Sequence, residues 1–225
     1  MRERVLTPEI LDFLSPGDPR AVRSRRDLVR INAVMRQSAI MAKLLAGLPA
    51  PNLLVDLGGG DGCFMLGVAR RLAKHWPGVT VAIADRQPIV SDETRARFAQ
   101  TGWHCESLTG DVFVTLPALK PDIITANLFL HHLDAPALAQ LLALAAGRAP
   151  GFVACEPERS ALALLGARLV GALGANDVTR HDAVASVEAG FNGRELSALW
   201  PMDRAWSLRE RRVFPFTHAF CAHAI

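Results

Sequence analysis

The sequence predicts an α/β fold, a doubly wound and mostly parallel sheet of seven strands that ends in an antiparallel hairpin. Three observations lead to this prediction. Hydrophobic residues make up 50% of the 225-residue chain, so a sizeable core can be buried. From residue 52 onward, short apolar runs alternate with helix-like stretches, which is typical of a parallel sheet covered by helices. The last two strand-like runs follow each other almost directly, so they can only pair antiparallel.

The first fifty residues are predicted to be helical. Residues 7–14 should form a short helix that Thr7 caps. A longer helix is expected over residues 21–48, where apolar side chains recur at helical spacing. We expect residues 1–50 to form a helical lid over a second unit, residues 51–225.

The alternation after residue 52 predicts the remaining elements. Parallel strands are expected at residues 53–57, 79–84, 103–108, 122–128 and 152–155. Helices are expected at residues 62–75, 89–100, 135–146 and 160–173. Two helical segments, at residues 183–189 and 193–200, form a predicted insertion at about residues 175–200. The hairpin strands are expected at residues 205–211 and 214–222.

The most informative segment is a glycine-rich turn between the first strand and the next helix. Glycine lets the backbone turn tightly and approach a ligand, and the helix start offers unpaired N–H groups. A dinucleotide fingerprint would need a third glycine where Cys63 stands. A phosphate-binding P-loop would need a lysine, and none is near. The segment instead has the pattern Asp-x-Gly-x-Gly-x-Gly, formed by Asp56, Gly58, Gly60 and Gly62.

This pattern resembles the first motif of the class I S-adenosylmethionine (SAM)-dependent methyltransferases, an acidic residue followed by Gly-x-Gly-x-Gly. Three further matches follow in order. They are Asp85 after the second strand, Gly110-Asp111 after the third, and the segment 122–134. The last contains Leu-His-His-Leu-Asp and resembles small-molecule methyltransferases. The resemblance covers about residues 52–156 and implies a Rossmann-like fold with SAM as the cofactor.

The resemblance also implies which residues bind SAM. Asp85 is expected to accept hydrogen bonds from the ribose hydroxyls, and Asp111 to contact the adenine amino group. The expected set is Asp56, Gly58, Gly60, Asp85, Arg86, Gly110, Asp111, Val112, Asn127 and Leu128. No metal ligands are expected, because no dense group of carboxylates surrounds Asn127. Activity should therefore not respond to a chelator.

Three histidines are candidates for a catalytic base. Methyl transfer requires alignment of the nucleophile and exclusion of water, and an oxygen nucleophile also benefits from a base, most often histidine. His131 and His132 follow the fourth strand, where cofactor and substrate meet in such sheets. His181 lies in the insertion that contributes to the substrate pocket in the resembled fold. The alternatives are packing for the pair and a helix-start position beside Asp182 for His181.

The net charge of +3 comes from the N-terminal segment, because residues 1–40 contain eight arginines against five acidic residues. One interpretation is a solvated helix face. An RNA-binding arm is disfavoured because no aromatic residues interleave the arginines of residues 23–36, so no nucleic-acid partner is expected. The third interpretation is a lid in which an arginine such as Arg30 approaches the SAM carboxylate.

The predicted function is methylation of a small hydrophobic acceptor. The preferred methyl acceptor is the oxygen of a phenol or polyketide-derived compound. Residues 8–16, the arginine-rich helix and residues 191–201 resemble bacterial methyltransferases associated with polyketide-derived phenolic lipids. C-methylation of a quinone or polyketide ring and SAM binding without turnover are the alternatives. Cys63 argues against an NAD-dependent oxidoreductase. The Pro-Pro motif common with nitrogen acceptors is missing after Asn127.

The remaining expectations concern the setting of the protein. The four cysteines are far apart and form no Cys-x-x-Cys pair, which favours free thiols in a reducing cytosol. No signal peptide and no membrane span are predicted. We therefore expect a cytoplasmic protein, with a homodimer possible through the hairpin edge or the N-terminal helices.

Overall fold

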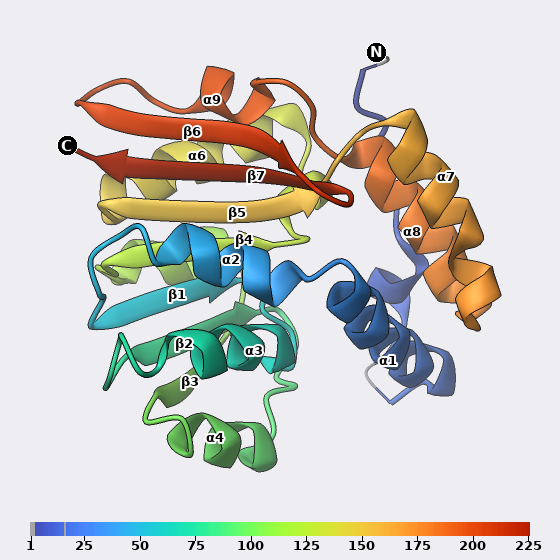
Figure 1. The fold of residues 1–225 in the computed structure, drawn as a ribbon, viewed down its shortest axis with the longest axis horizontal. Helices are drawn as coiled ribbons and strands as arrows, with labels where there is room; N and C mark the ends of the chain where they lie inside the picture. Colours follow the sequence, from blue (N-terminus) through green and yellow to red (C-terminus); the bar gives the residue numbers. More distant parts are fainter. Residues whose placement is uncertain (1–2, 16) are drawn as a thin grey trace.

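A seven-stranded sheet forms the centre of the computed structural model, which describes residues 3–15 and 17–225 (Figure 1). The strand order is β3-β2-β1-β4-β5-β7-β6. The first five strands are parallel, and β7 runs antiparallel to both β5 and β6. This confirms the predicted mixed sheet and its closing hairpin. The strands are β1 Leu53–Leu57, β2 Thr80–Asp85, β3 His104–Thr109, β4 Ile123–Asn127, β5 Gly151–Pro157, β6 Trp206–Val213 and β7 Thr217–Ala224.

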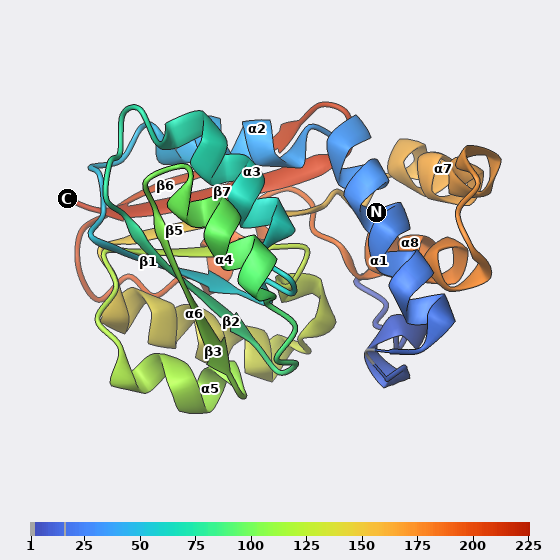
Figure 2. The same ribbon diagram turned by 90° about the horizontal axis from the view of Figure 1, so that it is seen from below.

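Helices cover both faces of the sheet, as Figure 2 shows. One face carries α2 Gln37–Leu45, α3 Cys63–Leu72 and α4 Asp92–Ala99. The other carries α5 Val112–Thr115 and α6 Ala135–Arg148, and the core on this side also includes Leu196 of α9 Glu195–Leu199. Because both faces are covered, the middle strands are apolar runs without alternation, and every residue of β5 is buried.

Two apolar cores lie on the two faces of the sheet. On the α6 side, the rings of Phe152 and Phe220 have centroids 5.3 and 5.4 Å from that of Trp200. On the α3 side, Met41 of α2 and Met65 of α3 are fully buried in the second core. Both cores are built on the sheet, so α2 belongs to the layers that hold the sheet in place.

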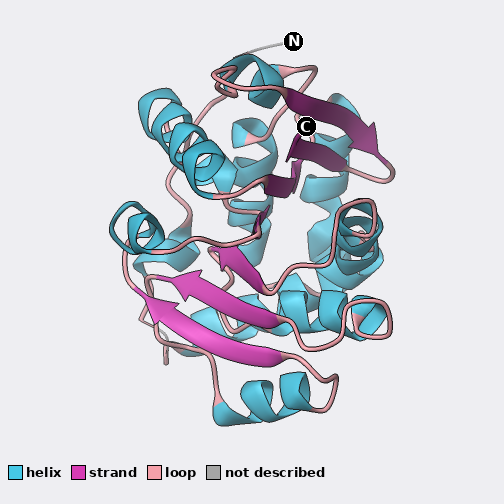
Figure 3. Ribbon diagram, turned by 90° about the vertical axis from the view of Figure 1, so that its left-hand side faces the viewer, coloured by secondary structure: helices cyan, strands magenta, loops and turns pink. Residues whose placement is uncertain are grey.

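A third group of helices stands at the end of the sheet toward which the parallel strands point (Figure 1). It contains α1 Pro19–Val34, α7 Ala161–Leu169 and α8 Asp177–Ala189. The short 3-10 helix Ile10–Phe13 packs against α8. Figure 3 shows the opposite end of the sheet, where helices flank the strands on both sides. The carboxyl ends of β1 and β4, where the strand order reverses, therefore face this helical group.

The N-terminal helices differ from the prediction. The expected helix over residues 21–48 is two helices, because Arg36 adopts a left-handed conformation with φ 56° and separates α1 from α2. The expected helix over residues 7–14 is a 3-10 helix of four residues without a side-chain cap, so Thr7 does not cap it. In short polar stretches next to turns, tertiary packing can override the helix that the residue pattern predicts.

The helix expected at residues 183–189 begins earlier, since α8 starts at Asp177 and is capped by the side chain of Asn176. The division into a lid of residues 1–50 and a second unit stays a prediction, although α2 packs against α3 and β5. Within the described residues, no helix combines the length and the apolar character needed to cross a bilayer.

Candidate active site

The glycine turn follows β1 directly and is fixed against β2. The backbone N–H groups of Gly58 and Gly59 donate to the carbonyl oxygen of Ala84 at 2.8 and 3.3 Å. Gly58 has φ +65°, and a Cβ there would come within 2.4 Å of the Phe129 ring. Gly60 has φ +57°, and a Cβ there would meet nothing within 4 Å. The turn therefore needs glycine for its conformation and offers open space in front of Gly60.

A cavity of about 340 Å³ lies beside this turn, at the carboxyl ends of β1 and β4. Its lining includes half of the SAM-binding set that the sequence predicted: Asp56, Gly58, Gly60, Asn127 and Leu128. The sequence did not predict the part of the lining that α1 forms. This part consists of Arg25, Leu28, Val29, Asn32 and Ala33, here called the α1 wall. No spacing rule connects α1 with the glycine turn, so only the fold reveals this wall.

Asp85 braces the glycine turn from the end of β2. Its Oδ2 accepts a hydrogen bond from the N–H of Gly60 at 2.9 Å, and its Oδ1 accepts one from the N–H of Gln87 at 2.8 Å. A carboxylate has about four acceptor positions, so both oxygens can accept further hydrogen bonds. Asp85 is not among the residues that line the cavity, and its contact with a ribose stays a prediction.

The other predicted adenine-side residues lie outside the cavity lining as well: Arg86, Gly110, Asp111 and Val112. The Arg86 guanidinium forms an exposed ion pair with Asp111 at 2.6 Å. Asp111 also caps α5 by accepting a hydrogen bond from the N–H of Phe113 at 2.9 Å. These contacts order the loop after β3.

The polar groups of the cavity fit SAM. The side-chain Oδ1 atoms of Asn32 and Asn127 are buried and have no hydrogen-bond partner among the described residues. Buried acceptors without a donor are costly, so both suit a ligand that brings N–H or O–H donors. SAM carries an ammonium group, two ribose hydroxyls and an adenine amino group. The acceptors of Asn32 and Asn127 can accept from two of these donors, and the open space in front of Gly60 allows the ligand to approach the backbone.

Asp56 lies under the turn and is buried. Burial raises the pKa of its carboxyl to about 7, and the charge of Asp85 adds to the shift. The hydroxyl of Thr125 donates to Asp56 at 2.7 Å and opposes the shift. Asp56 is therefore a buried group beneath the turn, while Asp85 fixes the turn through its hydrogen bond with the Gly60 N–H.

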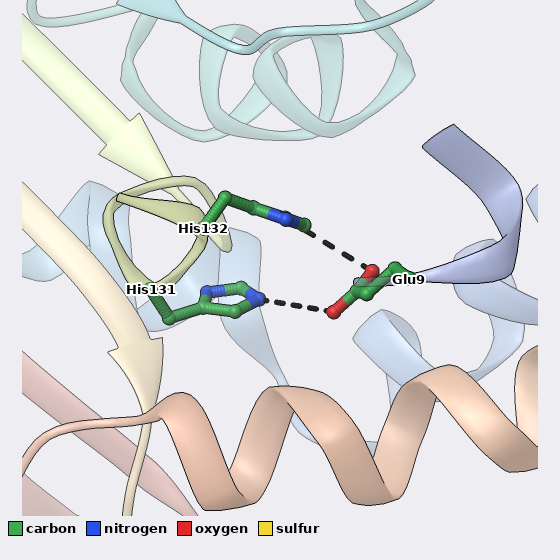
Figure 4. A group of neighbouring side chains, drawn as sticks. All are labelled: Glu9, His131 and His132. Atoms are coloured by element: carbon green, nitrogen blue, oxygen red, sulfur yellow. Dashed lines mark hydrogen bonds and ion pairs between the residues drawn. The ribbon is translucent and has the colours of Figure 1, made fainter. Parts of the chain in front are cut away.

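His131 and His132 lie in the 3-10 helix Leu130–His132, directly after β4 (Figure 4). Nδ1 of His131 is 2.7 Å from Oε2 of Glu156, a fully buried residue of β5. On the other side, Nε2 of His131 is 3.4 Å from Oε1 of Glu9. Nε2 of His132 is 4.0 Å from Oε2 of the same carboxylate. The structure thus brings the two predicted histidines together with acids that the sequence analysis did not select.

The exposure of the two histidines differs. His131 is 2% exposed, and burial would lower its pKa, but the hydrogen bonds to Glu156 and Glu9 raise the pKa to about 9. In this arrangement both of its ring nitrogens face carboxylates. His132 is 28% exposed, and its Nδ1 is 3.5 Å from Oδ2 of Asp12.

His181 does not join this cluster through any contact in the described part of the chain. It lies within α8 rather than at a helix start, its side chain is 45% exposed, and its Nδ1 is 2.9 Å from Oδ1 of Asp182. Asp182 in turn accepts hydrogen bonds from the N–H groups of Ile10 and Leu11 at 2.8 and 3.0 Å. His181 thus lies beside the N-terminal segment.

Hydrogen bonds hold the N-terminal segment against the histidines. The guanidinium of Arg4 donates to the carbonyl oxygens of His131 and Leu133 at 3.2 and 3.1 Å, and to that of Ala189 at 2.8 Å. The Ser186 hydroxyl donates to Glu9. Because Glu9 is more than a hundred residues from either histidine in the chain, no local motif could have indicated this contact.

The arginine predicted to reach the cofactor is placed differently. The Arg30 side chain is 73% exposed, lies 3.7 Å from Asp27 and is not among the residues that line the cavity. Arg25 lines the cavity instead. The lid interpretation therefore depends on Arg25, whose position α1 determines.

Comparison with known proteins identifies the family. Residues 21–151, more than half of the chain, match the O-methyltransferase domain. No curated protein matches. Among solved structures, an O-methyltransferase family protein from Burkholderia thailandensis is 19% identical with a TM-score of 0.59, over 93% of this chain and 63% of its own. The mitomycin 7-O-methyltransferase MmcR is 20% identical with a TM-score of 0.60, over 96% and 60%.

A third solved structure has nearly the same extent as this chain. The plantazolicin methyltransferase BamL, in complex with a triazolic desmethylPZN analog and SAH, is 13% identical with a TM-score of 0.62, and each chain is covered to 92%. These identities show a shared fold. The chain spans slightly less than two thirds of the length of several O-methyltransferase structures it matches. Together with the domain match, the fold shows that the chain belongs to the O-methyltransferase domain family of class I SAM-dependent methyltransferases.

Proposed function

We propose that this protein transfers the methyl group of SAM to an oxygen atom of a small hydrophobic molecule, such as a phenol or a polyketide-derived compound. The observation that carries the proposal is the cavity at the glycine turn, with its unpartnered acceptors on Asn32 and Asn127. The family match supports the reaction class, and the apolar side chains of α1 in the cavity lining support a hydrophobic acceptor.

The proposed roles at the cofactor end combine the family resemblance with the lining of the cavity. SAM, when bound, supplies a methyl group on a sulfonium and so needs no further activation. The backbone at Gly58 and Gly60 allows close approach, Asp85 accepts from the ribose, and Asp111 accepts from the adenine amino group. Asn32 and Asn127 offer acceptors to the amino-acid part. These residues bind and orient the cofactor for an in-line displacement.

The proposed acceptor end is the helical group formed by α1, α7 and α8. Leu28 and Val29 of α1 face the cavity and would exclude water from the transfer. We propose that the part of residues 1–50 that precedes α2 acts as the lid and residues 175–200 as the substrate insertion, because α2 is packed into the core of the sheet. The contacts of Ile10 and Leu11 with Asp182 join these two parts, so they would open and close together.

The proposed base is one of the three histidines, since a phenolic proton must be removed as the oxygen attacks the methyl carbon. His132 and His181 are partly exposed. His131 would be reached only after Glu9 moves away. Substituting each histidine by alanine should reduce kcat at least 10-fold for the base and less than 3-fold for the others, on the usual scale of acid–base catalysis of roughly 10²–10⁴-fold. Wild-type turnover in all three variants would contradict a histidine base.

The proposal is tested by incubating the protein with methyl-labelled SAM and a panel of phenols and hydroxylated aromatic polyketides. The expected product is a labelled aryl methyl ether, identified by NMR. Label on a ring carbon would indicate C-methylation instead. Bound SAM with no labelled product for any acceptor would contradict the enzymatic proposal and favour a SAM-binding partner protein.

A further inference from the structure

We propose that Glu9, His131 and His132 form a binding site for a divalent transition-metal ion, with Zn²⁺ as the first candidate. One ligand atom from each residue lies within 4.8 Å of the other two (Figure 4). Two imidazoles and one carboxylate are a donor set that Zn²⁺ uses in sites with an open fourth position. This inference goes beyond the proposed methyl transfer, which requires no metal. With the ion bound, Nε2 of both histidines would be a ligand, so the base in that state would be His181.

The spacing of the donor atoms leaves room for a small cation, because the hydrogen bond between His131 and Oε1 of Glu9 is long and His132 stands still farther from Oε2. Nε2 of His131 and Nε2 of His132 are 3.4 and 4.0 Å from the Glu9 carboxylate. A charged N–H···O⁻ hydrogen bond would bring such atoms to about 2.8 Å. Ligands at 2.0–2.1 Å from a tetrahedral Zn²⁺ stand roughly 3.3 Å apart. The 3.4 Å gap is close to that spacing, and the 4.0 Å gap would shorten by about 0.7 Å on binding an ion.

Each histidine also has a second carboxylate near its other ring nitrogen, at a short hydrogen-bond distance for His131 and farther away for His132. Nδ1 of His131 is 2.7 Å from Glu156, and Nδ1 of His132 is 3.5 Å from Asp12. Both rings therefore direct Nε2 toward Glu9. A carboxylate on the far nitrogen of a ligating histidine is the usual support of a protein metal site, because it fixes the ring and its tautomer. This is an observation independent of the Glu9 distances.

The charges of the cluster also favour a cation. Glu9, Asp12 and Glu156 bring three carboxylates to two imidazoles. The guanidinium of Arg4, which binds the backbone of this loop, supplies one positive charge. With both imidazoles neutral, a divalent ion would balance the remaining charge. A metal would also connect the N-terminal segment to the loop after β4.

The competing arrangement is a protonated His131 held between Glu156 and Glu9 without any metal. The sequence-based expectation of no metal rested on the cysteine spacing and on the residues near Asn127, and it could not anticipate a ligand from residue 9. The two arrangements differ in a measurable way. Only the metal site requires His132, and only the metal site takes up a cation stoichiometrically.

The test is calorimetric titration of Zn²⁺ into the EDTA-treated and dialysed full chain, with Co²⁺ absorption as a second measurement. We expect one Zn²⁺ per chain with a Kd of micromolar or lower. Glu9→Gln and His132→Asn should each weaken binding at least 10-fold. Glu156→Gln should weaken binding about 10- to 100-fold through its effect on His131. The control His181→Asn, a partly exposed histidine outside the cluster, should bind as the wild type does.

Co²⁺ should give the intense visible bands of a four- or five-coordinate site in the wild type, which tests the proposal even if a variant fails to fold. Absence of saturable one-to-one binding in the wild type would overturn the proposal. So would unchanged affinity in both Glu9→Gln and His132→Asn. SAM affinity, measured on the same samples, reports on the proposed function separately, because none of these residues lines the cavity at the glycine turn.

Discussion

The glycine-turn end and the histidine end of this site are built in different ways. The turn comes from one continuous strand–turn–helix segment, β1 to α3, in which backbone N–H groups and glycine conformations do the positioning. The histidine cluster is assembled from three separate segments, around residues 9, 131 and 156. A site made from backbone geometry leaves a spacing pattern in the sequence, whereas a site made from converging side chains does not.

The largest expected effect comes from breaking the turn with Gly58→Ala. The added Cβ would meet Phe129 at 2.4 Å, and φ +65° adds backbone strain of about 1–3 kcal/mol. We expect a loss of SAM affinity of at least 100-fold, measured by calorimetry. Gly78→Ala is the matched control, because Gly78 has φ +73° but nothing within 4 Å of an added Cβ. Equal SAM binding by the two variants would contradict the tight approach of the turn to Phe129.

The buried acids at the two ends differ in the direction of their pKa shifts. Burial raises the pKa of Asp56 to about 7, whereas for Glu156 burial is outweighed by hydrogen bonds to His131 and the backbone, so its pKa is lowered. An unfolded aspartate releases its proton near pH 4. Between about pH 4 and pH 7 the folded chain therefore binds more protons at Asp56, and this group should lower the free energy of unfolding as pH rises.

Asp56→Asn should remove this pH dependence, because the amide cannot ionise and can still accept from Thr125. The free energy of unfolding of the variant minus that of the wild type should rise by a few kcal/mol, on the order of magnitude set by the pKa shift, as the pH goes from 4.5 to 8. Urea unfolding at both pH values measures the difference. A constant difference between variant and wild type across this range would show that Asp56 titrates normally.

Half of the predicted SAM-binding set lines the cavity, namely Asp56, Gly58 and Gly60 from the glycine motif and Asn127 and Leu128 from the fourth strand, and their contact with SAM stays a prediction. The fold class followed from the strand–helix alternation. The α1 wall, Glu9 and the break at Arg36 could not be predicted. They depend on how separate helices pack at the end of the sheet, and a residue's distance along the chain carries no information about such contacts.

A smaller effect is expected from Asp85→Ala. This change removes the brace on Gly60 and the proposed ribose acceptor, and hydrogen bonds to a charged group contribute about 1.5–3 kcal/mol. SAM affinity should fall about 10- to 100-fold. Asp92→Asn, which changes an exposed acid on α4, should leave SAM affinity unchanged. A similar loss in both variants would indicate a general charge effect rather than a specific contact.

The smallest expected effect separates two arginines of α1. Arg25 lines the cavity, whereas Arg30 is 73% exposed beside Asp27. Arg25→Ala should therefore weaken SAM binding by about 1 kcal/mol or more, and Arg30→Ala should not change it. Calorimetry of both variants at two salt concentrations checks this. Weaker binding in Arg30→Ala alone would restore the lid arrangement that the sequence suggested.

Calorimetric titration of the wild-type chain with SAM and, separately, with NAD tests the proposed cofactor site most directly. We expect saturable binding of one SAM per chain and no binding of NAD, because the acceptors at Asn32 and Asn127 suit the donors of SAM, and Cys63 stands where a dinucleotide site needs glycine. Binding of NAD, or no binding of SAM, would contradict the proposed site.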